Sequence, residues 1–452
     1  MKKLALLAVL LLAPLLPAAP ARSAALELVG DEVLSADGRL HELTLASPAL
    51  ERQTKVRVLL PAAYGADGRR FPVFFLLHGA GDNHARWTNV TDVEELTADK
   101  NLIVVMPDGG SGSNSGWYSD GVAGPAWATY HIGELLPFID SHYDTVGTRE
   151  GRAIAGLSIG GFGAMSYAAR HPDLFGVAGS FSGLVDSTLA GPAQAAAYAA
   201  LNERYGTPDN RVWGDYSTNE LTWREHNPPD LSTNLRNTVL SLATGNGVPM
   251  PNDPPLSVPA EAALYPMNQS LHADLTLEGK NHVWRDRGYG THEWNYWQAD
   301  LHAFVNDVLM PALDRPPARP PWFSYRSARD SFAVWGWSFQ AQRQAREFVD
   351  VTDASAGGLT ARGSGSLRVT TPGLYTPGAE YEVQSDWSKV GGSHESSAGP
   401  VVADASGRLT YTVDLGPPHK FQQYTREAVL DEALAGPDHW RTVKVTIVRP
   451  VP

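Results

Sequence analysis

Short apolar runs that alternate with helix-like stretches are the feature that most restricts the fold of this chain. The runs read as buried strands and cover residues 71–79, 101–107, 152–158, 175–183, 238–247 and 272–279. The amphipathic stretches read as helices and cover residues 126–143, 161–172 and 294–309. Such alternation predicts an α/β class, with a doubly wound, mostly parallel sheet covered on both faces. The more polar segments 41–50 and 54–61 predict an antiparallel edge.

The alternation ends at a proline-rich segment, PALDRPPARPP at residues 311–321, which predicts a stiff linker. Beyond it, apolar and polar residues alternate between glycine and proline turns, as in strands with one buried face. One such face would hold Leu409, Tyr411, Val413 and Leu415. We therefore expect an α/β domain over residues 26–310 and an all-β, sandwich-like domain over residues 322–452.

The amino terminus predicts a secretory signal peptide over residues 1–25. Lys2 and Lys3 precede the apolar stretch Leu4–Leu16, which is too short to span a bilayer, and small residues follow at a suitable cleavage position. We therefore expect a secreted protein, extracellular or in the cell envelope, with no membrane span. The chain has no cysteine, which excludes a thiol nucleophile, and its formal net charge of −13 argues against nucleic-acid binding.

A serine set between glycines carries the first chemical signal. Gly156-Leu157-Ser158-Ile159-Gly160 fits the pattern G-x-S-x-G, in which a sharp strand-to-helix turn exposes the serine hydroxyl. The motif lies between the strand predicted at 152–158 and the helix predicted at 161–172, as its geometry requires. The helix N-terminus also favours negative charge nearby. We predict that Ser158 is a nucleophile that forms an acyl-enzyme.

A serine nucleophile needs a base, and the base needs an acid that orients it. The order serine, acid, histidine of α/β-hydrolases directs attention to His292, directly before the last predicted helix, with His282 as a weaker candidate. The acid should follow the strand at 238–247. Glu261 begins a helix-like stretch there, whereas Asp253 lies between prolines as in a solvated turn. We therefore predict Glu261 as the acid and keep Asp253 as the alternative.

The oxyanion of a tetrahedral intermediate needs backbone N–H donors. We predict Ile159, directly after the nucleophile, and Ala80, in a turn that resembles the His-Gly turns of esterases. His78, Trp117 and Tyr118 are the candidate residues of a substrate pocket. Further aromatic candidates are Trp127, Trp294 and Trp297. No metal or organic cofactor is expected, because Asp82, His84 and Asp108 do not have the spacing of a recognisable ligand set.

Five motifs occur in the order and spacing of the esterase D-like α/β-hydrolases: LLHGAGDN, IVVMPDGGSGSNSGWYSD, GLSIGG, ATGNG and GTHEWNYW. Within that family, residues 40–309 most resemble the secreted mycobacterial mycolyltransferases, the antigen 85 complex. The resemblance implies the α/β-hydrolase fold, Ser158 as nucleophile, His292 as base and a glutamate as acid about thirty residues earlier, which favours Glu261. Those transferases carry an acid before the turn glycine and an arginine after it, both serving the sugar acceptor. This chain has His78 and Gly81 there.

The leading expectation is a secreted serine esterase that hydrolyses carboxylic esters of small molecules or polymers. The first alternative is an acyltransferase of the mycolyltransferase type, which passes an acyl group to a sugar or lipid alcohol. The second is a non-catalytic adhesion or binding protein on a hydrolase scaffold. Contact with carbohydrate or the cell envelope is expected through the C-terminal domain.

Overall fold

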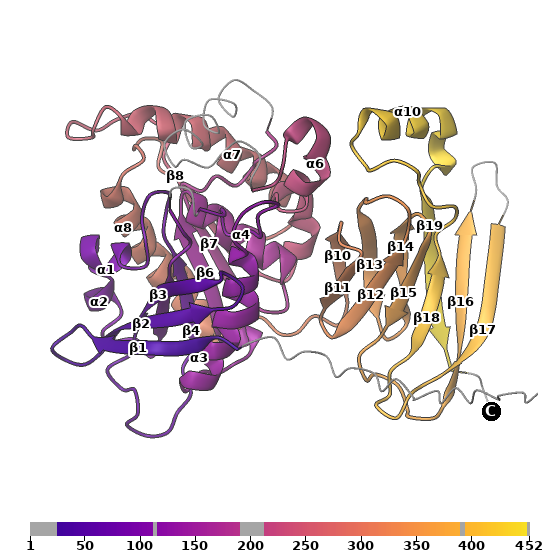
Figure 1. The fold of residues 1–452 in the computed structure, drawn as a ribbon, viewed down its shortest axis with the longest axis horizontal. Coiled ribbons are helices and arrows are strands. Elements are labelled where there is room, and N and C mark those ends of the chain that lie inside the picture. The colour runs from indigo at the N-terminus through magenta and orange to yellow at the C-terminus, as the bar shows by residue number, and fades with distance from the viewer. Residues whose placement is uncertain (1–24, 112–114, 190–211, 389–393, 450–452) are drawn as a thin grey trace, which may run out of the picture.

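The computed structural model describes residues 25–111, 115–189, 212–388 and 394–449. The predicted signal peptide lies outside these residues except for Ala25. Two units stand side by side: an α/β unit that contains the N-terminal two thirds of the chain, and an all-β unit that follows it (Figure 1). No helix among the described residues is long and apolar enough to cross a membrane.

A nine-stranded sheet forms the centre of the α/β unit, in the order β1-β2-β3-β5-β4-β6-β7-β8-β9. The strands from β5 to β9 in this order pair in parallel, and β1, β2 and β3 add the expected antiparallel edge. The α/β class is thus confirmed. The strands are β1 (Glu27–Val33), β2 (Leu40–Ser47), β3 (Arg52–Leu59), β4 (Val73–Leu77), β5 (Ile103–Pro107), β6 (Arg152–Leu157), β7 (Val177–Phe181), β8 (Val239–Thr244) and β9 (His282–Asp286).

Helices cover both faces of this sheet, because alternate residues of each central strand enter different cores. Phe75 and Ile154 pack with α4 and α7 on one face, whereas Phe74 and Ala155 pack with α8 on the other. The helices are α1 (Arg86–Val90), α2 (Val93–Leu96), α3 (Leu136–His142), α4 (Ile159–Arg170), α6 (Tyr216–Arg224), α7 (Ser257–Leu277), α8 (Trp294–Phe304) and α9 (Met310–Asp314).

One predicted strand is wrong. Residues 272–279 belong almost entirely to α7, and the last strand of the sheet is β9, which the sequence pattern did not indicate. The apolar residues of the misassigned segment alternate, but Leu275 is buried while Leu277 is 85% exposed. The buried set at Leu264, Met267, Leu271 and Leu275 has the spacing of a helix. The helix predicted at 126–143 is present from Trp127, with a π-helical segment at Thr129–Leu135 that continues into α3.

The all-β unit is a sandwich of two antiparallel sheets, which confirms the expected class. One sheet has the order β10-β13-β14-β19-β16-β17 and the other β11-β12-β15-β18, and a single apolar core fills the space between them. The strands are β10 (Phe323–Ser327), β11 (Ser331–Val334), β12 (Trp337–Gln342), β13 (Val349–Ser355), β14 (Gly358–Gly363), β15 (Ser366–Thr370), β16 (Glu380–Ser388), β17 (His394–Val402), β18 (Thr410–Asp414) and β19 (Arg441–Val448).

A helix that the sequence pattern did not indicate, α10 (Arg426–Ala435), interrupts the all-β unit between β18 and β19. The segments on either side of it are joined through His419. Its Nδ1 lies 2.6 Å from the buried Glu347 carboxylate, and its Nε2 lies 2.8 Å from the His439 carbonyl oxygen. Burial lowers the pKa of His419, but these two contacts outweigh it and raise the pKa above the usual value. Both partners are acceptors, so these contacts favour the protonated imidazole, in which both ring nitrogens donate.

Polar contacts hold the two units together. The Tyr325 hydroxyl donates to the Arg170 carbonyl at 2.6 Å, and the Trp335 backbone N–H donates to the Asp173 carboxylate at 2.9 Å. The chain crosses between the units at the proline-rich segment, whose first residues, 311–314, belong to α9. The linker expected at 311–321 therefore begins inside a helix, and β10 starts directly after it at Phe323.

Candidate active site

Ser158 lies at the tight turn between β6 and α4, at the carboxyl edge of the sheet. Its backbone has φ 54° and ψ −122°, a conformation that non-glycine residues rarely adopt and that is typical of a nucleophile elbow. A Cβ on Gly160 would lie 2.5 Å from the His78 carbonyl oxygen, and one on Gly156 would lie 2.6 Å from the Gly160 backbone. The two glycines are therefore required because the turn packs directly against backbone.

His292 stands between Ser158 and Glu261 and contacts both. Its Nε2 lies 3.0 Å from the Ser158 hydroxyl oxygen, and its Nδ1 lies 2.8 Å from a Glu261 carboxylate oxygen. The ring is held edge-on to Trp297, with centroids 4.7 Å apart, and the His292 backbone N–H donates to the Ser257 carbonyl. These three functional side chains come from separate segments that meet at the same sheet edge, and their order along the chain is serine, acid, histidine.

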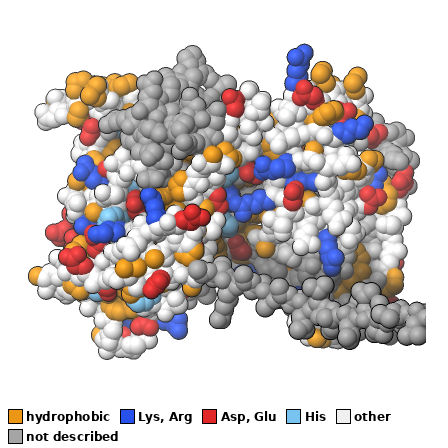
Figure 2. All heavy atoms as spheres, in the orientation of Figure 1, with side chains coloured by type: hydrophobic (Ala, Val, Ile, Leu, Met, Phe, Trp, Pro, Cys, Tyr) orange, Lys and Arg blue, Asp and Glu red, His pale blue; other side chains and the backbone are white. Residues whose placement is uncertain are grey.

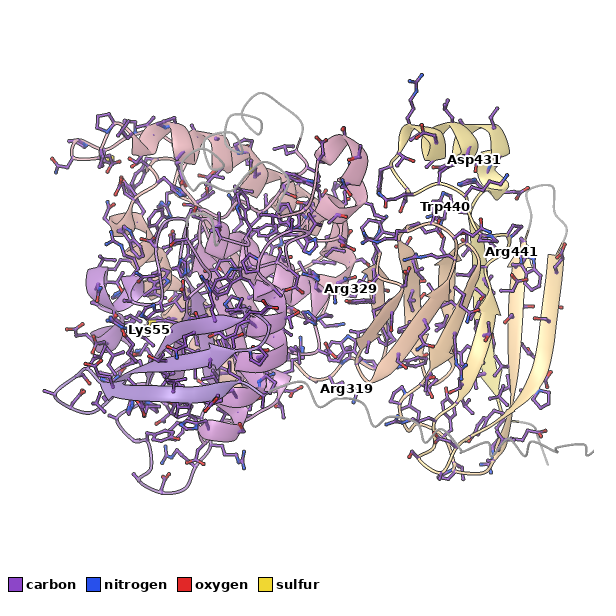
Figure 3. All side chains as sticks on the ribbon, in the orientation of Figure 1. Lys55, Arg319, Arg329, Asp431, Trp440 and Arg441 are labelled. Atoms are coloured by element: carbon purple, nitrogen blue, oxygen red, sulfur yellow. The ribbon has the colours of Figure 1, made fainter. Side chains whose placement is uncertain are left out.

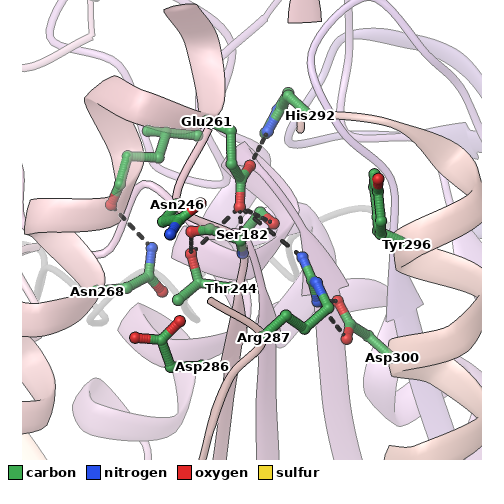
Figure 4. A network of polar contacts seen from close by, with 12 residues as sticks. Ser182, Thr244, Asn246, Glu261, Asn268, Asp286, Arg287, His292, Tyr296 and Asp300 are labelled. Carbon is green, nitrogen blue, oxygen red and sulfur yellow. Dashed lines mark hydrogen bonds and ion pairs between the residues drawn. The ribbon is translucent and has the colours of Figure 1, made fainter. Parts of the chain in front are cut away.

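Glu261 lies in the first turns of α7 and is completely buried. One carboxylate oxygen faces His292, and the other accepts hydrogen bonds from three donors (Figure 4). These donors are the Ser182 hydroxyl at 2.7 Å, the Gly245 N–H at 2.6 Å and the Thr244 hydroxyl at 3.2 Å. Burial raises the pKa of Glu261, but the contacts with His292, Ser182 and Gly245 outweigh it, so the pKa is lowered and the group is ionised.

The ionised Glu261 sets the proton positions on His292. A carboxylate only accepts, so Nδ1 of His292 carries the proton that faces it. In the neutral imidazole, Nε2 is then unprotonated and accepts the hydrogen of the Ser158 hydroxyl. The arrangement can therefore withdraw a proton from Ser158 and hold the resulting imidazolium beside a carboxylate.

A second ion pair stands behind the acid, and the sequence reasoning missed it. Arg287 Nη1 contacts both oxygens of Asp300 at 2.6 and 2.7 Å, while Nη2 lies 3.9 Å from Glu261. Figure 4 shows Arg287 between these two carboxylates. Burial outweighs the arginine and raises the pKa of Asp300 to about 6. Neither Arg287 nor Asp300 lies in a recognisable motif, so no sequence signal pointed to them.

The two alternative candidates lie away from the serine. The Asp253 carboxylate accepts from the Tyr296 hydroxyl at 2.7 Å and from the Met250 N–H at 2.8 Å, and it makes no contact with His292. His282 is the first residue of β9, which runs parallel to β8, so it lies at the amino edge of the sheet, opposite Ser158. The structure therefore brings Glu261 and His292 to the serine, and neither Asp253 nor His282.

His78 is 1% exposed and joins two loops at the sheet edge. Its Nδ1 lies 2.7 Å from the Gly79 carbonyl oxygen, and its Nε2 accepts from the Gly109 N–H at 2.8 Å. Because the C=O and N–H of one trans peptide point in opposite directions, the Ala80 N–H points away from His78. A Cβ on Gly79 would lie 3.5 Å from the Ser158 Cβ, so this turn lies directly beside the nucleophile.

The structure places the predicted pocket residues His78, Trp117 and Tyr118 in buried positions. Their side chains belong to the interior behind the site: Trp117 is 5% exposed and Tyr118 is completely buried. The Tyr118 hydroxyl donates to the His78 carbonyl oxygen at 2.9 Å and so supports the turn from below. Large aromatic side chains bury much apolar area, which favours the core over an open wall. Trp127 is likewise buried.

The acidic and histidine residues near the turn form separate pairs. Asp82 contacts Arg86 at 3.2 Å, His84 contacts Glu42 at 3.2 Å, and Asp108 lies 3.4 Å from His78. Within the described ranges, no group of three or more such residues is placed to hold a metal ion.

The chain is similar to known esterases and acyltransferases. Esterase Rv1288 of Mycobacterium tuberculosis is 43% identical over 152 residues, which is 32% of this chain and 33% of that protein, so the chain matches about a third of its length. The diacylglycerol acyltransferase/mycolyltransferase Ag85B of Mycolicibacterium smegmatis is 30% identical over 59% of this chain and 83% of that protein.

Among solved structures, MPT51 of Mycobacterium tuberculosis superposes with a TM-score of 0.50 at 23% identity, over 62% of this chain and 98% of that one. This likeness supports the fold of the α/β unit. The two curated relatives confirm the resemblance to esterases and mycolyltransferases. The model of the Esterase family matches residues 47–308, which is more than half of the chain and contains the whole site. This chain is therefore a member of the Esterase family.

Proposed function

We propose that this protein is a secreted serine esterase that hydrolyses carboxylic esters through an acyl-enzyme on Ser158. The observation that carries the proposal is the continuous chain of contacts from Glu261 to His292 to Ser158, at 2.8 and 3.0 Å. Membership of the Esterase family supports the reaction class.

In the acylation step, the Ser158 oxygen attacks the ester carbonyl carbon while Nε2 of His292 takes the hydroxyl proton. Negative charge develops on the carbonyl oxygen, and the backbone N–H groups of Ile159 and Ala80 are the proposed donors to it. The C–O bond to the alcohol then breaks, and the alcohol leaves with the proton returned by His292. Glu261 stabilises the imidazolium throughout and fixes its orientation.

In the deacylation step, water takes the place of the alcohol. His292 removes a proton from the water, whose oxygen attacks the acyl carbon, and the proton then passes to Ser158 as the acid leaves. Each atom of the water ends in the acid product or on the regenerated serine. The proposed chemistry requires no cofactor.

The test combines covalent labelling with turnover. A fluorophosphonate probe should label the wild type and not Ser158→Ala, and p-nitrophenyl esters of increasing chain length should be hydrolysed by the wild type only. Equal labelling of both proteins would place the nucleophile elsewhere. A folded wild type that neither reacts with the probe nor hydrolyses any ester would support the alternative of a non-catalytic binding protein.

Transfer of the acyl group to an alcohol is the second candidate, and two observations favour it. Ag85B is named as an acyltransferase, and the segment that follows the turn beside Ser158 carries an acid and an arginine, Asp82 and Arg86, in contact at 3.2 Å. Water at about 55 M must be outcompeted, which requires an oriented acceptor. We expect hydrolysis, since Asp82 is already paired within the chain. Acyl-trehalose as the main product at millimolar trehalose would establish transfer instead.

Secretion is proposed from the N-terminal pattern, with cleavage after Ala25. N-terminal sequencing of protein recovered from the culture medium tests it, and retention of residues 1–25 would contradict it. Binding of the all-β unit to carbohydrate remains a proposal, which a pull-down on insoluble polysaccharides tests.

A further inference from the structure

A cavity of about 290 Å³ lies between the two units, far along α4 from the serine. Its α/β wall includes Arg170 and His171, at the end of α4, and Glu225. Its all-β wall includes Tyr325, Arg329 and Ser338. Figure 2 shows lysine and arginine side chains gathered along this boundary, and Figure 3 labels Arg329 on it.

The charges around this cavity do not balance. Arg170 is only 7% exposed, and its Nη1 has no hydrogen-bond partner among the residues that the structure describes. Arg329 makes no side-chain ion pair within the same residues. The one carboxylate of the lining, Glu225, contacts Arg346 at 2.7 Å and is thereby neutralised.

A third arginine of the lining, Arg326, has its own carboxylate, Asp350, at 3.2 Å. Asp173, also close to this boundary, accepts the Trp335 N–H. His171 adds no further charge, because burial and the neighbouring Arg170 lower its pKa to about 3 and keep the ring neutral. The cavity therefore presents two guanidinium groups, from Arg170 and Arg329, without a counter-charge.

The buried Arg170 guanidinium has a donor, Nη1, without an acceptor, which is unfavourable unless an oxygen atom reaches it. Guanidinium groups match the geometry of carboxylate and phosphate, each of which can accept two parallel hydrogen bonds. The cavity volume accommodates such a group, and Ser338 lines the same space. The Tyr325 hydroxyl is already committed to the Arg170 carbonyl.

We propose that this cavity is a binding site for a small oxyanion, a phosphate or carboxylate group, which bridges Arg170 of the α/β unit and Arg329 of the all-β unit. The bound anion joins the two units at the end of α4, the helix that begins directly after Ser158. The proposal does not depend on the esterase reaction, because none of the residues that carry it contacts the serine, the histidine or the acid.

The experiment measures the melting temperature of the full-length protein as sodium phosphate or sodium glucuronate is added. Sodium chloride at equal ionic strength is the reference. Binding to the folded state alone should raise the melting temperature in a saturable manner, by about 3 °C or more at saturation. Phosphate tests a free anion, and glucuronate tests a carboxylate borne on a sugar. Calorimetric titration provides the stoichiometry, expected to be one site per chain.

Two variants test the assignment, and one variant is the control. Arg170→Gln and Arg329→Gln should each abolish the saturable rise, whereas Arg368→Gln, an equal charge change at an exposed position of β15, should retain it. Because Arg329 is exposed, its variant stays informative even if Arg170→Gln fails to fold. No saturable rise in the wild type, or an equal rise in Arg329→Gln, would overturn the proposal.

Discussion

Replacing Glu261 by glutamine tests the reasoning about proton positions directly, because the change preserves shape and alters only donors and acceptors. One Glu261 oxygen accepts from Ser182, Thr244 and Gly245, and the other faces His292. The glutamine carbonyl must keep the side with three donors. Its NH2 group then faces Nδ1 of His292 and donates to it.

That reversal forces the imidazole into the other tautomer. With Nδ1 as acceptor, Nε2 of His292 carries the proton and points it at Ser158, so no base remains for the serine hydroxyl. The corresponding acid-to-amide change in another serine hydrolase lowers kcat about 10⁴-fold, and we expect about 10³ to 10⁴ here. The fold should persist, since the three donors to the carbonyl oxygen are retained.

Glu261→Ala separates orientation from tautomer. It leaves the histidine free to adopt either tautomer, so its kcat should exceed that of Glu261→Gln. It also leaves three buried donors without their acceptor. Each donor that no water molecule reaches lowers the unfolding free energy by about 1–3 kcal/mol. The alanine variant is therefore expected to be more active and less stable than the glutamine variant.

The assay is the initial rate on p-nitrophenyl acetate, with urea unfolding of each variant measured in parallel. Asp253→Asn is the matched control, the same acid-to-amide change in the segment that precedes α7, and it should retain near-wild-type kcat. A Glu261→Gln variant that is folded and retains more than a tenth of the activity would refute the tautomer argument.

Three other outcomes follow from the same structure. Ser158→Ala and His292→Ala should each lower kcat on the same ester about 10⁶-fold without loss of fold, because the groups act as a unit; retention of a per cent of activity would exclude that role. Gly160→Ala should lower both the activity and the unfolding free energy, the latter by about 1–3 kcal/mol, since its Cβ would press on backbone. The raised pKa of His419 beside Glu347 contributes stability below pH 6.5 that is lost as pH rises through the folded-state pKa. His419→Gln should remove that alkaline decline in urea midpoint, and an unchanged decline would assign it elsewhere.

The sequence sufficed where a local rule decides the structure. The central strands are apolar throughout because both faces are covered, and the serine turn demands glycine on both sides. The same is true of the all-β unit, where Tyr411 and Val413 alternate with exposed residues. These patterns involve neighbours in the chain, so they are visible without the fold.

The sequence failed where partners are distant in the chain. Arg287 pairs with Asp300 and lies near Glu261, and only the fold brings these three residues together at the sheet edge. The pattern around Tyr118 does not indicate that its side chain is buried and donates to the His78 carbonyl oxygen. The segment at 272–279 alternates like a strand, and only the burial of Leu275 beside the exposure of Leu277 identifies a helix.

The strands that carry the hydrogen-bond donors to Glu261 affect how the protein loses activity on heating. Thr244 ends β8 and Ser182 follows β7, two central parallel strands whose amides should exchange with solvent only through global opening. His292 instead stands on a loop between an edge strand and α8, where local opening costs less. On heating, the loop that carries His292 should therefore open before the central strands separate. Activity is expected to fade reversibly at temperatures where hydrogen exchange still reports an intact sheet, and to recover on cooling until the strands themselves separate.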